Sequence, residues 1–405
     1  MKVHLKTDVI CTLFLVIILC LLIYLHFDVL SPRERQEKYT FGPLTNIRIS
    51  STEAVKTIAL EDDISVTQNE HRCEEKDQVV DKSLPSASAT TVTPPSSFNF
   101  HQYLLDKDKR HFQLLINQPR KCRKASNDPF LLIAIKSVLE DFERREVVRK
   151  TWGKEGQING LEVRCIFLLA VPKNQTALPL WRDLAHYESE TYGDILLWEF
   201  LDTFFNLTLK EIHFLKWAHE FCSNVKFIFK GDADVFVNTE NIINFLNSYN
   251  ANEDLFVGDI ILQAQPIRSK TSKYYIPEII YGQGLYPSYA GGGGFLMSAF
   301  TMKKLFKACN EVELFPIDDV FLGMCLLRTG LKPVAHEGFR TFGIIKPSAA
   351  PHLQTYNPCF YKELMVVHSL KVAEIWLMWK LLHDPTLTCT QKEVIERPFR
   401  WKQKS

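Results

Sequence analysis

The chain has 405 residues, of which 46% are hydrophobic and 12% are aromatic. This is enough for one large globular domain with extensions, or for two domains, with a substantial apolar core. The formal net charge of +1 gives no overall attraction to polyanions, so the composition argues against a nucleic-acid-binding protein.

An uncharged run near the amino terminus predicts a membrane anchor. Residues 9–25 carry no charged side chain, and His26 and Phe27 extend the run. At about 1.5 Å per residue, a helix over 9–27 roughly crosses the hydrocarbon core of a bilayer. A secretory signal peptide is the alternative, but its apolar region is shorter and a small-residue cleavage site should follow, which HFDVLSPRE does not offer. We therefore predict a cytoplasmic tail over 1–8 and a signal-anchor over 9–27, with basic residues on both sides leaving its orientation open.

The next segment, 28–110, is predicted to be a stem. It includes SLPSASATTVTPPSSF, a stretch rich in Ser, Thr and Pro. Such a composition buries too little apolar surface to fold by itself. Residues 100–122 are more apolar and are expected to pack onto the globular domain, which we assign to 111–405.

Sequons and cysteines indicate a lumenal location for that domain. Asn174 and Asn206 each begin an Asn-x-Thr sequon and are predicted glycosylation sites. Eight of the ten cysteines lie outside the apolar run. None of them forms a C-x-x-C pair, which argues against a zinc site. Widely spaced cysteines in even number fit a disulfide-bonded domain, although buried free thiols are the alternative. The pairing stays open.

From residue 129 onward, apolar runs alternate with helical patterns. Strands are predicted in PFLLIAIKS, VRCIFLLA, DILLWEF and VKFIFK, and helices in EDFERREVVRKTWG, in a stretch ending near Tyr192, and in NLTLKEIHFLKWAHEFC. Continuous apolar strands of this kind are typical of buried parallel sheets. The alternation predicts an α/β fold with a mostly parallel sheet.

Two carboxylates directly follow the last of these strands. In KFIFKGDADVFVN, Asp232 and Asp234 stand at the carboxyl end of a predicted buried strand, where open α/β sheets bind their ligands. Mg²⁺ and Mn²⁺ are typically held by one or two carboxylates together with substrate phosphates. A pair of solvated turn acids is the alternative. The spacing excludes an EF-hand, because Phe236 and Val237 occupy positions where that loop needs an acidic or amide residue and a glycine.

Two further segments complete the candidate chemistry. AGGGGF would let the backbone approach a ligand closely, although a flexible loop is the simpler interpretation. FPIDDVFLG places Asp318 and Asp319 at the start of a predicted helix, where acids are common as caps. Asp319, in a partly apolar setting, is a candidate general base.

These motifs together resemble glycosyltransferase family 31, the β1,3-galactosyl- and β1,3-N-acetylglucosaminyltransferases of the Golgi. The resemblance spans about residues 129–370 in the family's order, and it is strongest for the poly-N-acetyllactosamine synthase type. The matching stretches are REVVRKTWG, DTFFNLTLK, KFIFKGDADVFVN, DLFVGDI, YYIP, LYPSYAGGGGFLMS, PIDDVFLGMCLLRTGL and GFRTF.

The resemblance implies a GT-A fold, a Mn²⁺ cofactor and roles for particular residues. Asp232 and Asp234 would bind the metal and the nucleotide sugar, with His368 completing the metal site, and Asp319 would be the catalytic base. The nucleotide side would be formed by Lys136, Arg145, Arg149 and Trp152.

The implied reaction is an inverting transfer of N-acetylglucosamine from UDP-GlcNAc, in β1,3 linkage, to galactose-terminated glycans. A β1,3-galactosyltransferase that uses UDP-galactose is one alternative, which Asp318 disfavours because that branch usually carries Glu there. An inactive glycan-binding relative is another. The implied setting is a single-pass type II protein of the Golgi membrane, and association with itself or with related transferases stays open.

Overall fold

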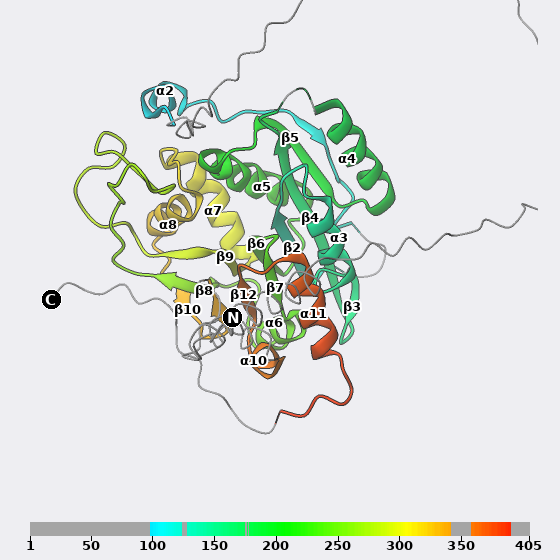
Figure 1. The fold of residues 1–405 in the computed structure, drawn as a ribbon. Coiled ribbons are helices and arrows are strands. Elements are labelled where there is room, and N and C mark those ends of the chain that lie inside the picture. Colours follow the sequence, from blue (N-terminus) through cyan, green and yellow to red (C-terminus); the bar gives the residue numbers. More distant parts are fainter. Residues whose placement is uncertain (1–97, 124–127, 175, 177, 342–357, 390–405) are drawn as a thin grey trace, which may run out of the picture. The chain divides into compact units, whose positions relative to one another are not determined.

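The computed structural model describes residues 98–123, 128–174, 176, 178–341 and 358–389 (Figure 1). The predicted tail, the predicted anchor over 9–27 and most of the predicted stem lie outside the described residues. Among the described residues, we find no helix with the length and apolarity needed to span a bilayer.

The described part of the chain has a mixed α/β fold built on a central nine-stranded sheet (Figure 1). The strand order is β1-β5-β4-β2-β6-β9-β8-β10, and β3 pairs with β4. A smaller sheet has the order β11-β12-β7. The strands are β1 Leu114–Ile116, β2 Leu131–Lys136, β3 Gly156–Ile158, β4 Leu161–Val171, β5 Ile195–Leu201, β6 Phe227–Asp232, β7 Val235–Val237, β8 Phe256–Ile261, β9 Tyr289–Ser298, β10 Val334–Ala335, β11 Phe339–Arg340 and β12 Val366–His368.

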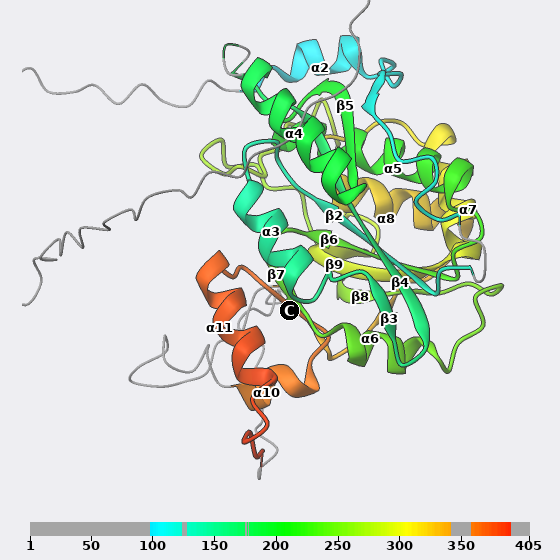
Figure 2. The same cartoon turned by 90° about the vertical axis from the view of Figure 1, so that its right-hand side faces the viewer.

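Helices cover both faces of the central sheet. They are α2 Phe100–Asp106, α3 Phe142–Lys150, α4 Leu178–Tyr192, the 3-10 turn η2 Phe204–Asn206, α5 Leu207–Phe221, α6 Thr239–Leu246, α7 Ala299–Glu311, α8 Asp318–Thr329, α10 Pro358–Glu363 and α11 Val372–Leu382. Helices α3 and α4 lie on one face, and α5, α7 and α8 lie on the other (Figures 1 and 2).

Side-chain alternation along β2 explains why two apolar layers form. Leu131 and Ile133 belong to the core on the α3 side, whereas Leu132 and Ala134 belong to the core on the α5 side. Successive residues of a strand point to opposite faces, so a strand that is apolar at every position is covered on both sides. The run LLIAIK is buried throughout, as a central parallel strand requires.

The strand and helix predictions from the first half of the domain agree with the structure. Strands β2, β4, β5 and β6 follow the predicted runs, and adjacent members of this group pair in parallel. Strand β9 is antiparallel to both β6 and β8, β1 is antiparallel to β5 and β3 to β4, whereas β10 is parallel to β8, so the sheet is mixed rather than mostly parallel. Within the predicted stem, α2 packs on the α5-side core through the buried Tyr103.

Two disulfides join the described cysteines. Cys122 is bonded to Cys222, and Cys359 to Cys389. The other described cysteines, Cys165, Cys309 and Cys325, are buried free thiols. Both interpretations of the cysteines in the sequence therefore apply, each to a different set. Cys11, Cys20 and Cys73 lie outside the described residues.

We expect the disulfide that spans the longer loop to stabilise the domain more. The double substitution Cys122→Ala with Cys222→Ala should lower the free energy of unfolding by about 2–5 kcal/mol, because the disulfide restricts the unfolded chain. The matched control is Cys359→Ala with Cys389→Ala. This second disulfide closes a loop of 30 residues rather than 100, so its removal should lower the free energy of unfolding by about 1 kcal/mol less in the chain-entropy account. Urea unfolding measures both values, and a larger loss for the shorter loop would contradict the expectation.

Candidate active site

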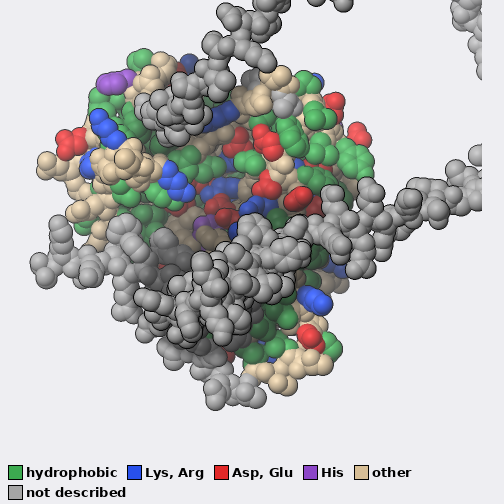
Figure 3. All heavy atoms as spheres, in the orientation of Figure 1, with side chains coloured by type: hydrophobic (Ala, Val, Ile, Leu, Met, Phe, Trp, Pro, Cys, Tyr) green, Lys and Arg blue, Asp and Glu red, His purple; other side chains and the backbone are tan. Residues whose placement is uncertain are grey.

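The carboxyl ends of β2 and β6 bring the first predicted residues together. Lys136 and Asp232 are partners in the parallel ladder between these strands. The Lys136 ammonium lies 3.0 Å from Asp232 Oδ1 and 2.7 Å from Asp318 Oδ2. One buried lysine thus joins the acid that ends β6 to the acid that begins α8. Acidic, basic and histidine side chains gather near the centre of the face shown in Figure 3.

A candidate metal centre forms where β12 pairs with β7. This antiparallel pairing sets His368 opposite Val235, so its side chain joins those of Asp232 and Asp234. One potential ligand atom from each of the three residues lies within 4.8 Å of the others. His368 Nε2 is 3.2 Å from Asp234 Oδ1 and 3.9 Å from Asp232 Oδ2.

The backbone fixes how the His368 ring is presented. Its Nδ1 lies 2.6 Å from the carbonyl oxygen of Thr341, and an N–H at Nδ1 can donate to that oxygen. The opposite nitrogen, Nε2, is then the one that faces the carboxylates, an arrangement common for metal-binding histidines. Burial lowers the pKa of His368, but the hydrogen bond and negative charge of Asp234 outweigh it and raise the pKa. Conversely, burial raises the pKa of Asp234, and His368 brings it below the ordinary value.

The two acids at the start of α8 have different environments. Asp318 is buried, and although burial raises its pKa, the charge and hydrogen bond of Lys136 hold that pKa below its usual value. Asp319 is partly exposed. The part of Asp319 that is buried, together with the charge of the adjacent Asp318 carboxylate, raises the pKa of Asp319 well above its usual range. The positive charge of Lys136 acts in the opposite direction but is outweighed. A carboxylate with a raised pKa, next to one that is locked in an ion pair, is the arrangement expected of a general base.

The glycine run on β9 lies directly against these groups. A Cβ at Gly292 would lie 3.2 Å from Asp319 Oδ2 and 3.5 Å from Asp232 Oδ2. A Cβ at Gly293 would lie 2.9 Å from the Cβ of His368. The AGGGGF segment is part of strand β9 rather than a flexible loop, and the absence of side chains lets its backbone lie close to Asp319, Asp232 and His368.

Alanine at two of these glycines should separate an effect on activity from an effect on stability. Gly292→Ala places a methyl group between two carboxylates with little backbone strain, so we expect an activity loss of up to about 10²-fold in a folded protein. Gly294 has a φ of +151°, and a Cβ there would lie 2.7 Å from the Phe229 ring, so Gly294→Ala should cost about 1–3 kcal/mol of stability. Gly160→Ala, at a φ of +78° in the turn between β3 and β4 and with nothing within 4 Å of its Cβ, is the control and should leave turnover unchanged. Thermal unfolding and turnover of the three variants test this, and a destabilised but fully active Gly292→Ala would contradict it.

A buried ion pair beneath the site did not emerge from the sequence. Lys230 on β6 donates to Glu211 on α5, and both side chains are almost inaccessible to solvent. A lone lysine within the apolar run FIFKG was the available signal, because a buried charge requires a partner. The pair supports the strand that ends at Asp232.

The structure does not bring Arg145, Arg149 and Trp152 into contact with the acidic cluster. Arg145 is fully buried and donates to Glu188 at 2.6 and 2.7 Å. Trp152 is also buried, within the α3-side core. Both side chains have a structural role in this fold, and the nucleotide contact that the family resemblance implied for them stays a prediction.

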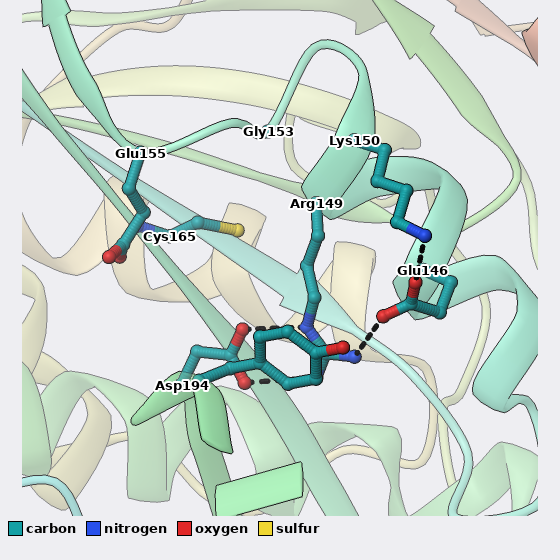
Figure 4. Close-up of a pocket in the computed structure, with 8 residues that line it drawn as sticks. Glu146, Arg149, Lys150, Gly153, Glu155, Cys165 and Asp194 are labelled. Carbon is teal, nitrogen blue, oxygen red and sulfur yellow. Dashed lines mark hydrogen bonds and ion pairs between the residues drawn. The ribbon is translucent and has the colours of Figure 1, made fainter. Parts of the chain in front are cut away.

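Arg149 instead lines a separate cavity of about 230 Å³ (Figure 4). Its guanidinium pairs with Asp194 at 2.8 Å and lies over the rings of Tyr192 and Phe167. Cys165 on β4 lines the same cavity. In the sheet, Cys165 lies opposite Ile133 in the middle of β2, so this part of the cavity wall lies away from the carboxyl ends of the strands, where the acidic cluster is. The cavity is lined by Glu146, Arg149, Lys150, Gly153, Glu155, Cys165, Tyr192 and Asp194.

The two sequon asparagines differ in exposure. Asn174 is exposed, whereas Asn206 is half-buried and donates through Nδ2 to the Leu201 carbonyl at 2.9 Å. Glycosylation of both remains a prediction.

Comparison with known proteins establishes the family. The family model described as Galactosyltransferase matches residues 143–337. A human protein named UDP-GlcNAc:betaGal beta-1,3-N-acetylglucosaminyltransferase 9 is 57% identical over 324 residues, which cover 76% of this chain and 81% of that protein. The chain belongs to the galactosyltransferase family.

Two further relatives also carry the name β-1,3-N-acetylglucosaminyltransferase. A mouse protein named UDP-GlcNAc:betaGal beta-1,3-N-acetylglucosaminyltransferase 7 is 50% identical, covering 73% of each chain. A human protein named N-acetyllactosaminide beta-1,3-N-acetylglucosaminyltransferase 3 is 45% identical, covering 75% of this chain and 82% of that one. The resemblance to glycosyltransferase family 31 is confirmed, and this member of the galactosyltransferase family is a glycosyltransferase.

Proposed function

We propose that the protein transfers N-acetylglucosamine from UDP-GlcNAc to the 3-hydroxyl of a terminal galactose, with inversion to a β linkage. The observation that carries the proposal is the position of Asp319 and Asp232 on either side of Gly292, a residue without a side chain. A base candidate and a metal-binding acid thus face one space at the carboxyl edge of the sheet, where α/β proteins bind ligands. The relatives at 45–57% identity, all named β-1,3-N-acetylglucosaminyltransferases, support the choice of donor sugar and linkage.

The residues present fit a divalent cation such as Mn²⁺. Asp232, Asp234 and His368 offer two carboxylates and an imidazole nitrogen, which suit a first-row metal. The hydrogen bond from Nδ1 to Thr341 holds the ring in the required orientation. When bound, the cation would neutralise negative charge on the diphosphate leaving group. This arrangement at the end of β6 is the basis for assigning the fold to the GT-A type.

The remaining chemistry rests on the protein's own groups. The Asp319 carboxylate accepts the proton of the acceptor 3-hydroxyl. The hydroxyl oxygen forms its bond to the anomeric carbon from the face opposite the diphosphate, and the bond between that carbon and the diphosphate oxygen breaks. Lys136, held between Asp232 and Asp318, keeps the two ends of this site at a fixed separation.

The cellular setting belongs to the same proposal. A signal-anchor over 9–27 would make the protein a type II protein of the Golgi membrane, with residues 111–405 in the lumen. The two disulfides are consistent with an oxidising compartment.

Transfer assays with two donor sugars, each with and without Mn²⁺, test the proposal. The full chain, solubilised in detergent, is incubated with N-acetyllactosamine and either UDP-GlcNAc or UDP-galactose, in Mn²⁺ or in EDTA. We expect GlcNAc transfer that requires Mn²⁺, and a β1,3 linkage in the product by NMR. Transfer of galactose alone would replace the donor assignment. A folded protein that transfers neither sugar to any galactose-terminated acceptor would overturn the enzyme assignment in favour of a glycan-binding relative.

A further inference from the structure

We propose that Arg268 is a positioning residue for the acceptor glycan, because it holds the loop between β8 and β9 in the shape that the acceptor contacts. This inference rests on the proposed function for the identity of the acceptor. The loop, residues 262–288, is here called the acceptor loop.

The acceptor loop leaves the sheet at the same edge as the acidic cluster. Its two ends are joined by the pairing of Ile261 with Tyr289. Strand β9 then runs antiparallel to β6 and reaches Gly231, the neighbour of Asp232, at Gly294. Tyr289 therefore lies beyond the carboxyl end of β6, on the side where Asp232 ends that strand.

The end of the loop also rests on the helix that carries the base candidate. A Cβ at Gly323 of α8 would lie 2.8 Å from the Tyr289 Cβ and 2.9 Å from the Ser288 carbonyl oxygen. Gly323 is four residues, about one helical turn, after Asp319, so the two positions share one side of α8. A displacement of the loop end would consequently alter the space beside Asp319.

One guanidinium links distant parts of the loop. Arg268 Nη1 donates to the Ile276 carbonyl at 2.6 Å, and Nη2 donates to the carbonyls of Tyr281 and Gly282 at 2.7 Å each. These carbonyls lie 8, 13 and 14 residues further along the chain. Hydrogen bonds from an ionised donor are stronger than neutral ones, and the planar fork of arginine fixes their directions.

Apart from the isolated bridge between Ile267 and Tyr275, regular structure is nearly absent from the acceptor loop. Long irregular loops within compact domains are usually functional. Ala264, Ile276 and Tyr286 anchor the loop in the α5-side core, and the bonds of Arg268 join the more exposed segments around these anchors. Because Arg268 is exposed, its bonds compete with water, and their loss should loosen the loop without unfolding the domain.

The surface that the loop presents suits a sugar ring. Tyr274, Ile279 and Leu285 are exposed apolar side chains of the loop. The Tyr274 ring contacts Phe204, which follows the carboxyl end of β5, and the Lys273 ammonium lies over both rings. Exposed aromatic and apolar groups on a loop that leaves the sheet at the edge of the acidic cluster offer a surface for the apolar face of a pyranose.

Kinetics of Arg268 variants test the proposal, using the full chain in detergent and N-acetyllactosamine as the acceptor. Arg268→Ala should raise the KM for the acceptor by roughly tenfold or more, because the acceptor must then order the loop as it binds. The KM for UDP-GlcNAc should stay within about twofold of the wild-type value. Arg268→Lys, which supplies a point charge instead of a fork, should recover the acceptor KM only in part. Arg328→Ala, which removes an exposed arginine at the end of α8, is the matched control and should change neither KM.

A second variant and a second readout keep the test decisive. Tyr274→Ala removes an exposed ring without touching the Arg268 bonds, and it should raise the acceptor KM selectively even if Arg268→Ala proves hard to fold. Hydrogen exchange should be faster within 262–288 in Arg268→Ala than in the wild type, and the difference should be confined to the loop. Equal increases in both KM values, or unchanged exchange in the loop, would overturn the proposal. Hydrogen exchange requires no turnover. It therefore tests whether Arg268 orders the acceptor loop even if the wild type transfers no sugar and the proposed function fails.

Discussion

Asp319→Asn should reduce kcat by about 10²- to 10⁴-fold, because the amide keeps the shape of the carboxylate but cannot accept the acceptor's proton. The effect should be on turnover rather than on folding, since Asp319 is partly exposed and its neighbour Asp318 carries the ion pair with Lys136. Initial rates at saturating donor and acceptor, together with the thermal midpoint, measure the two quantities separately.

The matched control for Asp319→Asn is the same substitution at an exposed ion pair. Asp254 pairs with Lys304 at the surface, so Asp254→Asn should leave both kcat and the thermal midpoint nearly unchanged. A kcat in Asp319→Asn equal to that of the control would remove Asp319 from the mechanism. If Asp319→Asn also lowered the thermal midpoint, the main role of Asp319 would instead be structural.

Loss of a metal-centre ligand should have an effect of similar size. Asp234→Asn and His368→Ala should each weaken Mn²⁺ binding by at least about 10- to 100-fold, the effect usual for groups that only support a ligand. Activity should fall in parallel and recover partly at high Mn²⁺, because mass action refills a weakened site. Titration of Mn²⁺ followed by electron paramagnetic resonance, without any sugar nucleotide, measures the affinity directly.

His383→Ala serves as the control for the histidine substitution. His383 is an exposed residue just after α11, so its removal should not affect Mn²⁺ affinity. If all three variants bind Mn²⁺ as the wild type does, the cluster of Asp232, Asp234 and His368 is not the metal centre, and the acids after β6 need another explanation.

Local patterns predicted much of the first half of the domain. The apolar runs of β2, β4, β5 and β6 are long enough to be recognised as buried parallel strands, and the position of Asp232 at a strand end follows from the run before it. The antiparallel strand β9 was harder to recognise, because glycines occupy its middle and a glycine run usually indicates a loop.

Contacts between distant segments were not predictable in the same way. His368 reaches the metal centre only through the pairing of β12 with β7, and nothing local in MVVHS indicates that pairing. The burial of Arg145 was likewise not predictable: the family resemblance implied a place on the nucleotide side, and only the fold shows that Glu188 from α4 neutralises this arginine inside the core.

The disulfide between Cys122 and Cys222 has a consequence for how the domain is assembled during synthesis. The covalent ring encloses β2, β4 and β5 with their helices, whereas Asp232, Asp319 and His368 all emerge later. Until β6 follows, the half-sheet has an open edge along the apolar strand β2, and such an edge favours pairing with other chains. Strand β6 starts at Phe227, five residues after Cys222. The cross-link has both its cysteines only five residues before the next strand begins, and once formed it tethers that strand close to the edge of β2 that the strand must cover.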